Sequence, residues 1–345
     1  MTITDRRRDA AAVRTRLWVD GALANENFPL EDVSDHLCQP QALVWVDLCN
    51  PGHRLLTELA GELGFDAPAV EDIVEHAART KATRYATHTF LTVYATSLGP
   101  QVPGSIESRL LTARVSIFLL PSAVVTVRHE SDPARPIFDI DEVVRRWDDN
   151  SDLLRDGSPA LLHGILDVVI DEQFDTIQQL DDGIEALEDA LFDDRSQTRQ
   201  LQRDTYRLRK ELVELRRIVL PMREAVNTVM RRVPPGAQDS ELAGWYSDLY
   251  DHAIRAGEWT ESLRDMVTTV FETNLSLQDA RLNTIMKKLT GWAAIIAVPT
   301  LVTGWYGQNI PYPGYGNNWG VWASALLSAI ASVALYVGFT RRGWI

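Results

Sequence analysis

The sequence predicts a mixed α+β membrane protein with an N-terminal α/β domain, a set of long helices and a C-terminal transmembrane hairpin. Three observations support this fold class. Strand-like apolar runs lie in the first 155 residues, and helical periodicity follows them. An acidic run, Leu161–Asp194, contains 11 acidic residues and no Lys or Arg. The 52 residues between Lys288 and Arg341 include no Asp, Glu, Lys or Arg, although the rest of the chain is densely charged.

Residues 1–155 form the predicted cytoplasmic α/β domain. Four runs rich in apolar and β-branched residues predict strands, with a Pro-Ser turn between the last two: 43–48, 90–95, 115–120 and 124–127. Helices are expected over 55–63 and 70–78, and Asp66 and Pro68 introduce the second. This half has no glycine-rich phosphate loop, HExxH or GxSxG motif. We therefore expect no enzyme.

Residues 156–236 predict long antiparallel helices. The first covers 161–192 and carries the acidic run; the second covers 198–232 and ends at a Val-Pro-Pro-Gly sequence, residues 233–236. The acidic run has two interpretations that do not exclude each other. It is a solvated helix face, or it creates a field that gathers cations and repels nucleic acid.

Residues 237–288 predict a stalk helix that continues into the membrane. It starts near Asp239 and meets no proline before Pro299. Its apolar positions step by three and four, as in a seam that packs against other helices: Leu242, Trp245, Leu249, Ala253, Ala256, Trp259, Leu263, Met266 and Val270. At about 1.5 Å per residue, a helix that continues through the first span is about 100 Å long. One chain of this size cannot cover such a seam, so we expect a homo-oligomer.

Residues 289–345 predict the transmembrane hairpin, with spans over 289–306 and 321–339. Helices of 18–19 residues are about 27–29 Å long, close to the thickness of a bilayer core. Lys287 and Lys288 precede the first span, Arg341 and Arg342 follow the second, and the loop 310–320 has no basic residue. The positive-inside rule then places both termini in the cytoplasm of a multi-pass protein of the inner or plasma membrane. The alternative is a buried hairpin in a soluble core, for which the spans are too long and too free of charge.

One face of the first span is a candidate pore lining, because two spans cannot enclose a pathway unless several chains surround an axis. Small or weakly polar residues, with a Met/Leu constriction near the cytoplasmic end, share this face at helical spacing: Asn283, Met286, Leu289, Ala293, Ala297, Thr300 and Gly304. An apolar ring of this kind can gate a pore by dewetting. The same small residues also suit plain helix packing in a membrane bundle, and composition does not separate the two interpretations.

The sequence around the end of this span resembles the CorA family of divalent-cation transporters. The family's signature, Tyr-Gly-Met-Asn at the end of the penultimate span, is matched here by Tyr-Gly-Gln-Asn at residues 306–309. Shorter segments at 45–48, 70–73 and 248–252 resemble family segments in the same order, as does the basic and aromatic end at 341–344. The resemblance covers the chain from about residue 40 onward.

The resemblance implies a homopentameric funnel whose stalk helices and first spans line one central pore. By the same resemblance, Gly307, Gln308 and Asn309 form the outer selectivity filter, and Asp248 helps to hold regulatory Mg²⁺ between subunits. A ring of Asn carbonyls accepts hydrogen bonds from the waters of a hydrated Mg²⁺ ion, which loses them reluctantly. Asp248 has an alternative as an ordinary solvated helix residue.

The sequence also departs from the family pattern. Gln308 replaces the family's Met, the outer loop 310–320 has no carboxylate, and no carboxylate lies near 94–97, where the partner of Asp248 is expected. Three alternative functions therefore remain: a Mg²⁺ or Co²⁺ channel, a proton-linked Zn²⁺ transporter of the ZntB kind, or a non-conducting membrane-anchored sensor. The first span offers no His or Cys that would favour a softer ion.

Overall fold

The computed structural model describes residues 12–74, 79–102, 105–132, 135–192, 198–231, 241–308 and 311–345. The chain divides into two compact units, with the boundary after Val270. The first unit contains the sheet and the helices that pack on it. The second contains the apolar part of the longest helix and the last helix.

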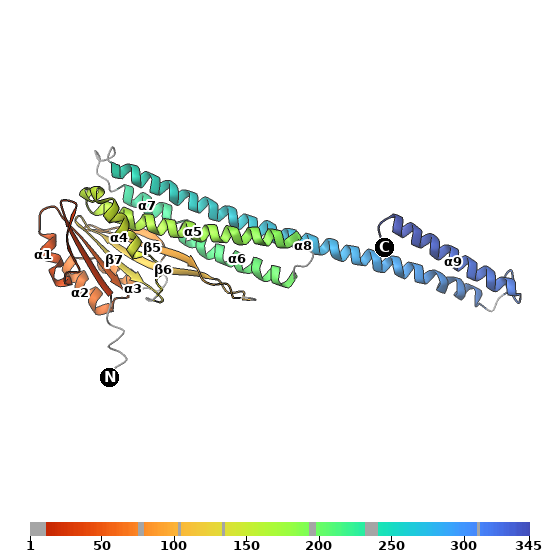
Figure 1. Cartoon of the computed structure of the whole chain (residues 1–345). Helices are drawn as coiled ribbons and strands as arrows, with labels where there is room; N and C mark the ends of the chain where they lie inside the picture. The colour runs from red at the N-terminus through yellow and green to blue at the C-terminus, as the bar shows by residue number, and fades with distance from the viewer. Residues whose placement is uncertain are drawn as a thin grey trace, which may run out of the picture. The chain divides into compact units, whose positions relative to one another are not determined.

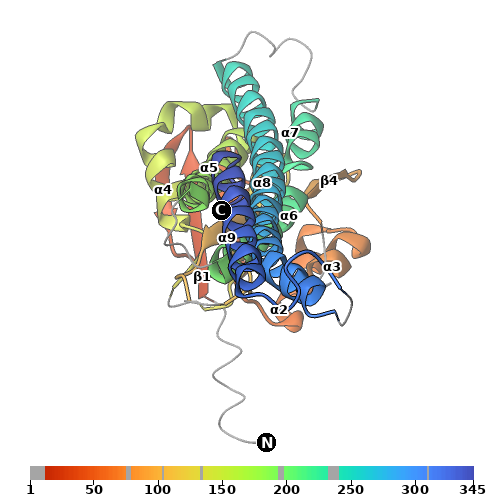
Figure 2. The same ribbon diagram turned by 90° about the vertical axis from the view of Figure 1, so that its right-hand side faces the viewer.

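The first unit is built on a mixed sheet whose seven described strands follow the order β2-β1-β3-β7-β6-β5-β4. Their bounds are β1 Ala12–Val19, β2 Ala22–Glu26, β3 Ala42–Cys49, β4 Lys81–Arg84, β5 Thr89–Leu98, β6 Leu110–Leu119 and β7 Ala123–His129. β3 and β7 are parallel, whereas the other neighbouring strands are antiparallel. Figure 2 shows β1 and β4 toward opposite edges of the sheet.

Both faces of the sheet are covered, because successive side chains of each buried strand point to opposite sides. One face packs against α1 (Val33–Leu37), α2 (His53–Leu63) and α3 (Ala67–Val74). The other packs against α4 (Ile140–Asp149), α5 (Ser158–Phe192), α7 (Met222–Met230) and the start of α8. On this second face the ring of Trp147 meets those of Trp45 and Trp18 edge-on, with centroids 4.9 and 5.7 Å apart. Short 3₁₀ turns cover Leu30–Asp32 and Ser151–Asp156.

The four predicted strands are confirmed as β3, β5, β6 and β7, and the Pro-Ser hairpin joins β6 to β7. Five of the described strands and helices were not predicted from the sequence: β1, β2, β4, α1 and α4. β1 carries Arg and Thr among its apolar residues, β2 is exposed along its length, and β4 has four residues, so none shows a clear apolar alternation. The predicted helix over 70–78 corresponds to α3, and residues 75–78 lie outside the described ranges.

The single helix expected over 198–232 is wrong, because the structure has two helices there. α6 covers Thr198–Val219, and α7 begins at Met222 after Leu220 and Pro221. A proline inside a helix removes a backbone donor and its ring clashes with the carbonyl four residues earlier. The apolar stripe of the sequence continues through Pro221 and hid this break.

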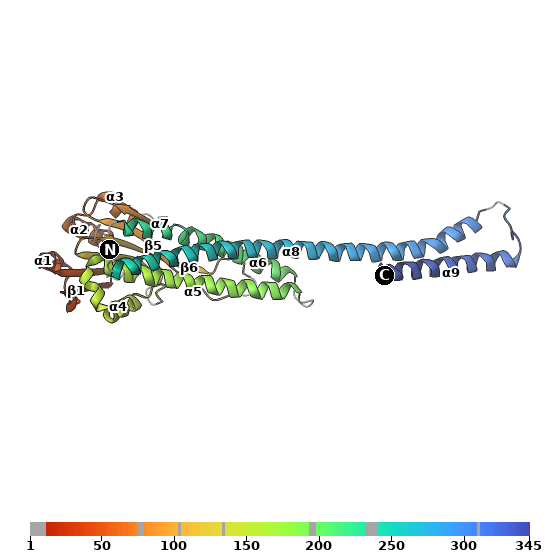
Figure 3. The same cartoon turned by 90° about the horizontal axis from the view of Figure 1, so that it is seen from above.

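α8 is one helix over Glu241–Tyr306, as expected from the absence of a breaker before Leu289, and it continues through Pro299. α9 covers Asn318–Arg341. In the first unit, α5 and the start of α8 lie side by side (Figures 1 and 3). Tyr246 of α8 donates its hydroxyl to the Pro159 carbonyl of α5 at 2.8 Å, and Trp259 donates to Asp181 at 3.3 Å.

The apolar windows of α8 and α9 are long enough to span a membrane, and 6% of each is buried within the chain. A core helix of a soluble protein would be mostly buried. The low burial therefore argues against the alternative of a buried soluble hairpin.

Candidate functional site

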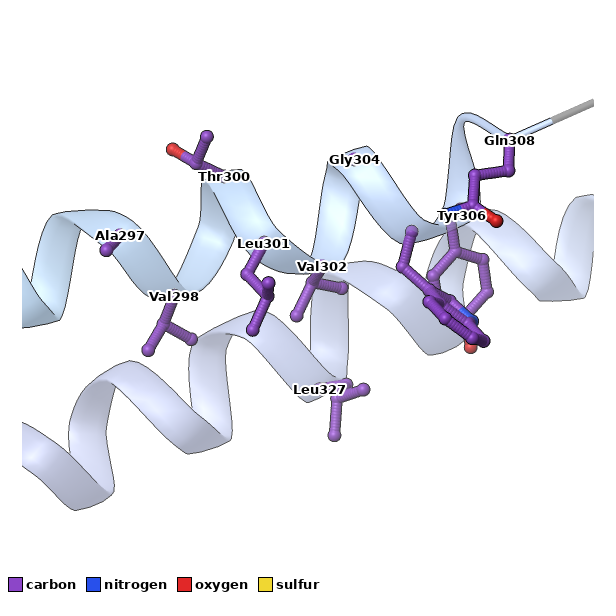
Figure 4. Close-up of a pocket in the computed structure, with 10 residues that line it drawn as sticks. Ala297, Val298, Thr300, Leu301, Val302, Gly304, Tyr306, Gln308 and Leu327 are labelled. Atoms are coloured by element: carbon purple, nitrogen blue, oxygen red, sulfur yellow. The ribbon is translucent and has the colours of Figure 1, made fainter.

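In the second unit, one side of α8 packs against α9 and the C-terminal residues. The least exposed positions follow each other at intervals of three and four residues: Gly291, Ile295, Val298, Val302 and Tyr306. A Cβ atom on Gly291 would lie 3.0 Å from the side chain of Ile345 and 3.7 Å from that of Phe339, so the two segments approach closely there. Figure 4 shows Val298 and Val302 on the side of α8 that faces Leu327 of α9.

The seven candidate pore residues lie on the opposite side of α8. At about 100° of rotation per residue, their average direction is roughly 180° from that of the row that packs on α9. Figure 4 shows the side chain of Thr300 pointing away from α9. All seven positions are exposed: Met286 is 58% and Leu289 62% accessible. Nothing in the described part of this chain covers them.

The seven candidate pore residues form a strip along α8, and large apolar side chains border this strip on both sides. Ile285, Trp292 and Ile296 lie along one border, and Leu301 and Trp305 along the other; all are exposed by 48–76%. A groove of about 870 Å³ lies on the side of the second border. Its lining includes Thr300, Gly304 and Gln308 together with Leu301 and Trp305, and it extends to Val298 and Val302 and to Leu327 of α9 (Figure 4). So much exposed apolar surface requires lipid or neighbouring chains around the helix.

The predicted filter begins where α8 ends, at Tyr306. The Gly307 N–H donates to the Thr303 carbonyl at 2.8 Å, and a Cβ atom on Gly307 would lie 3.0 Å from that oxygen. Glycine therefore suits this position because of the close backbone approach and not because of a left-handed conformation, since its φ is not positive. Gln308 is exposed, and its N–H donates to the Trp305 carbonyl at 3.3 Å. Asn309 lies outside the described residues.

Aromatic rings that the sequence analysis did not single out follow this end. Tyr312 meets Tyr306 and Tyr315 edge-on, with ring centroids 5.0 and 5.3 Å apart. Gly314, with a φ of +95°, lies against the ring of Trp319. The signal in the sequence was the clustering of aromatic residues around glycines in 311–320. The described part of the loop between α8 and α9 is therefore packed by its own aromatic rings.

Asp248, the predicted regulatory residue, lies on α8 in the first unit. Its side chain is 71% exposed, and its Oδ2 atom is 3.7 Å from Nε2 of His252. Thr96, in the segment where a partner carboxylate was expected, donates instead to Thr176 at 2.9 Å. Within the described ranges, no three His, Cys, Asp or Glu side chains gather in a way that would hold a metal ion. Around Asp248, the described part of the chain therefore offers no complete set of metal ligands.

The acidic run of α5 divides into two parts. Arg146 of α4 forms ion pairs with Asp167 and Asp171, the latter at 2.7 Å. Further along, the carboxylates of Asp175, Asp182, Glu185, Glu188 and Asp189 are exposed. The first part joins α4 to α5, and the second fits the interpretation as a solvated acidic face.

Glu172 is the exception on α5, because its carboxyl group is largely buried. Burial raises the pKa of Glu172 to about 8; the charges of Asp139, Glu130 and Asp175 add to this, and the hydrogen bond from the Asp139 N–H opposes it. Between about pH 4.5 and 8 the folded protein holds a proton that the unfolded chain has released. The free energy of unfolding is therefore expected to fall as pH rises through this window, by at most about 1.4 kcal/mol per unit from this group.

Glu172→Gln tests this expectation. The difference in unfolding free energy, variant minus parent, should grow from pH 5 to pH 8 in urea titrations, because the variant has no proton to lose. Glu185→Gln, at an exposed position of the same helix, is the control and should follow the parent. If the difference in unfolding free energy between Glu172→Gln and the parent does not change with pH, the carboxyl group of Glu172 does not have a raised pKa in the folded protein.

Comparison with known proteins matches most of the chain to metal ion transporters. A family model described as CorA-like Mg²⁺ transporter protein matches residues 40–341. A putative metal ion transporter of Bacillus subtilis, YfjQ, is 27% identical over 92% of this chain and 94% of its own. The cobalt/magnesium transport protein CorA of Thermotoga maritima is 27% identical over 87% of this chain and 83% of its own.

Two solved structures share the fold. The complete CorA magnesium transporter from Methanocaldococcus jannaschii superimposes with a TM-score of 0.72 at 21% identity, covering 96% of this chain and 98% of that one. The ZntB cytoplasmic domain from Vibrio parahaemolyticus gives a TM-score of 0.55 at 13% identity, covering 77% and 98%. The first match extends over the α/β unit and both apolar helices, so the predicted fold class is confirmed.

Proposed function

This chain belongs to the CorA family of divalent metal ion transporters, which are not enzymes, and we propose that it conducts Mg²⁺, with Co²⁺ as a second ion, through a pore formed by α8 of several copies. The observation that carries the proposal is the exposed, uncharged strip on the side of α8 opposite α9. In the described part of the second unit, α8 turns small and weakly polar residues away from α9, and such a surface is suited to line a shared axis.

We propose five copies around that axis, as the family resemblance implies. The seven strip residues would line the pore, with Met286 and Leu289 at its cytoplasmic constriction. The large side chains that border the strip, such as Trp292 and Trp305, would pack against neighbouring chains or lipid. Lys287, Lys288, Arg341 and Arg342 would keep both termini in the cytoplasm, so that the loop around Tyr312 faces outward.

The proposed selectivity follows from the chemistry of the filter residues Gly307, Gln308 and Asn309. Mg²⁺ keeps several of its waters, and amide carbonyls accept hydrogen bonds from these waters without a fixed charge that would hold the ion too tightly. Gln308 adds a second amide at the position where the family has Met. Two adjacent amide rings favour a hydrated hard cation over an ion that prefers nitrogen or sulfur ligands.

Metal flux in liposomes tests the choice of ion. We expect Mg²⁺ to move down its gradient in the purified full-length protein, with Co²⁺ competing, and with no response to an imposed proton gradient. Zn²⁺ flux that follows the proton gradient would support transport of the ZntB kind instead. If neither ion moves while the protein is folded and oligomeric, the non-conducting sensor is the remaining function.

We further propose that Asp248 contributes to a regulatory Mg²⁺ site shared between subunits. The acidic chain supports this: five copies carry 5 × (−14) = −70 formal charges, so bound cations would relieve repulsion between them. Asp248→Asn is expected to raise, by about tenfold or more, the internal Mg²⁺ concentration that halves the flux. Asp251→Asn, at an exposed neighbour on α8, should leave that concentration unchanged. Equal inhibition of Asp248→Asn and the parent would assign Asp248 to the solvated helix surface.

A further inference from the structure

A cavity of about 360 Å³ lies in the first unit, on the sheet face covered by α2 and α3. Polar residues from three adjacent strands contribute to it in register. Tyr94 of β5 lies opposite Arg114 of β6, and Arg114 lies opposite His129 of β7. Thr112 stands two residues before Arg114 and therefore on the same face of the sheet.

The cavity lies beside the start of α2, which follows the carboxyl end of β3. Pro51 and His53 line it there. The N-cap residue of α2, Gly52, has no side chain to accept from the first N–H groups of the helix. Such groups, together with the helix dipole, favour a negative charge. β3 and β7 are parallel, and their carboxyl ends border the cavity, which is the usual place for ligands in open α/β sheets.

The described residues that line the cavity are basic or uncharged. The nine described residues that line it include Arg114, His53 and His129 and none that is acidic. Arg114 is 9% exposed; it donates to the Ile73 carbonyl, and its Nη2 lies 3.3 Å from both ring nitrogens of His129. Burial lowers the pKa of Arg114, so its cationic form is held in a poorly solvated place. Tyr94 and Asp72 partly oppose this lowering of the Arg114 pKa, and Asp72 is itself bound to Lys81 Nζ at 2.7 Å.

We propose that this cavity binds a small oxyanion, namely phosphate or a phosphate monoester. Hydrogen-bond donors to such an anion come from several elements. They are the guanidinium of Arg114, the imidazoles of His53 and His129, the hydroxyls of Tyr94 and Thr112, and the first N–H groups of α2. Phosphate oxygens accept several hydrogen bonds at once and are bound strongly by cationic donors. A volume of 360 Å³ is at the lower end of small-molecule sites and leaves room for a small group esterified to the phosphate. The site is separate from the proposed ion pathway.

Calorimetric titration of the purified full-length protein with inorganic phosphate, at constant ionic strength, tests the proposal. We expect saturable binding with one site per chain. His53→Gln and Thr112→Val should each weaken it about tenfold, and Arg114→Gln by more. His53 and Thr112 are exposed, so their variants are expected to fold. They test phosphate binding even if Arg114→Gln does not fold.

Arg54→Gln is the matched control, because Arg54 follows His53 on α2, is exposed and pairs with Glu58 outside the cavity. It should bind phosphate as the parent does. A glucose phosphate titrated in parallel distinguishes a monoester site from a phosphate site, and either result supports an oxyanion site. Absence of saturable binding at millimolar phosphate, or equal weakening by Arg54→Gln and His53→Gln, would overturn the proposal. Ion flux plays no part in this measurement, so failure of the transport proposal would not affect it.

Discussion

Asn309→Ala is expected to reduce divalent-cation flux by about a hundredfold or more while leaving assembly intact. Each chain contributes one amide to the proposed filter ring, so the change removes an acceptor from every subunit at once. A hydrogen bond to a charged or strongly polarised group contributes about 1.5–3 kcal/mol, and 1.4 kcal/mol corresponds to a factor of ten. Loss of several such bonds leaves the hydrated ion without a binding site at the pore entrance.

Asn317→Ala is the matched control for this variant. Asn317 is an exposed amide of the outer loop, and its side chain makes no capping hydrogen bond to α9. Its removal should leave flux near that of the parent. The filter assignment fails if Asn309→Ala conducts as the parent does, or if the two variants lose flux to the same extent while both still assemble.

Asp47→Ala is expected to destabilise the α/β unit by about 3–5 kcal/mol, because it removes the closest partner of the buried Arg128. The carboxylate of Glu130, 3.8 Å from Arg128, is too far away to replace the lost hydrogen bonds. Asp47 is fully buried in β3, and Arg128 of β7 donates to its two carboxylate oxygens at 2.8–3.1 Å. The hydroxyl of Thr126 donates to the same carboxylate at 2.7 Å and accepts from the indole of Trp45. These bonds join the two parallel strands at the centre of the sheet.

Urea unfolding of the full-length protein, followed by tryptophan fluorescence, measures this loss. Glu58→Ala is the control, since its partner Arg54 is fully exposed, and we expect no measurable change from it. An unfolding midpoint of Asp47→Ala equal to that of the parent would show that the buried network does not stabilise the sheet.

The parts of the fold that could be predicted from the sequence are those with a continuous local pattern. β3 is buried along its whole length and reads as an apolar run. The apolar windows of α8 and α9 are long and free of charge, and these two properties together indicated membrane-spanning helices. The seven strip residues could be grouped because they lie on one helix, where helical spacing determines which side chains share a face.

The parts that could not be predicted depend on register and tertiary packing. The row Tyr94–Arg114–His129 exists because three strands pair in one alignment, which their separate sequences do not specify. Likewise, Glu172 looks like its acidic neighbours on α5, and its sequence does not show that the fold brings it to the start of α4, where the Asp139 N–H donates to it at 3.0 Å. The break at Pro221 was visible in the sequence, but the apolar stripe around it masked the signal.

The proposed pore lining is tested most directly by thiol modification on opposite sides of α8. Thr300→Cys and Val302→Cys are made in a Cys38→Ser background, because Cys38 is exposed and the other cysteine, Cys49, is buried. A bulky cationic thiol reagent is applied while Mg²⁺ flux is running in liposomes. We predict that flux through Thr300→Cys falls about tenfold or more, since the reagent would occupy the pore, and that flux through Val302→Cys persists. Block of Val302→Cys with sparing of Thr300→Cys would place the pathway on the other side of the helix and contradict the proposed pore.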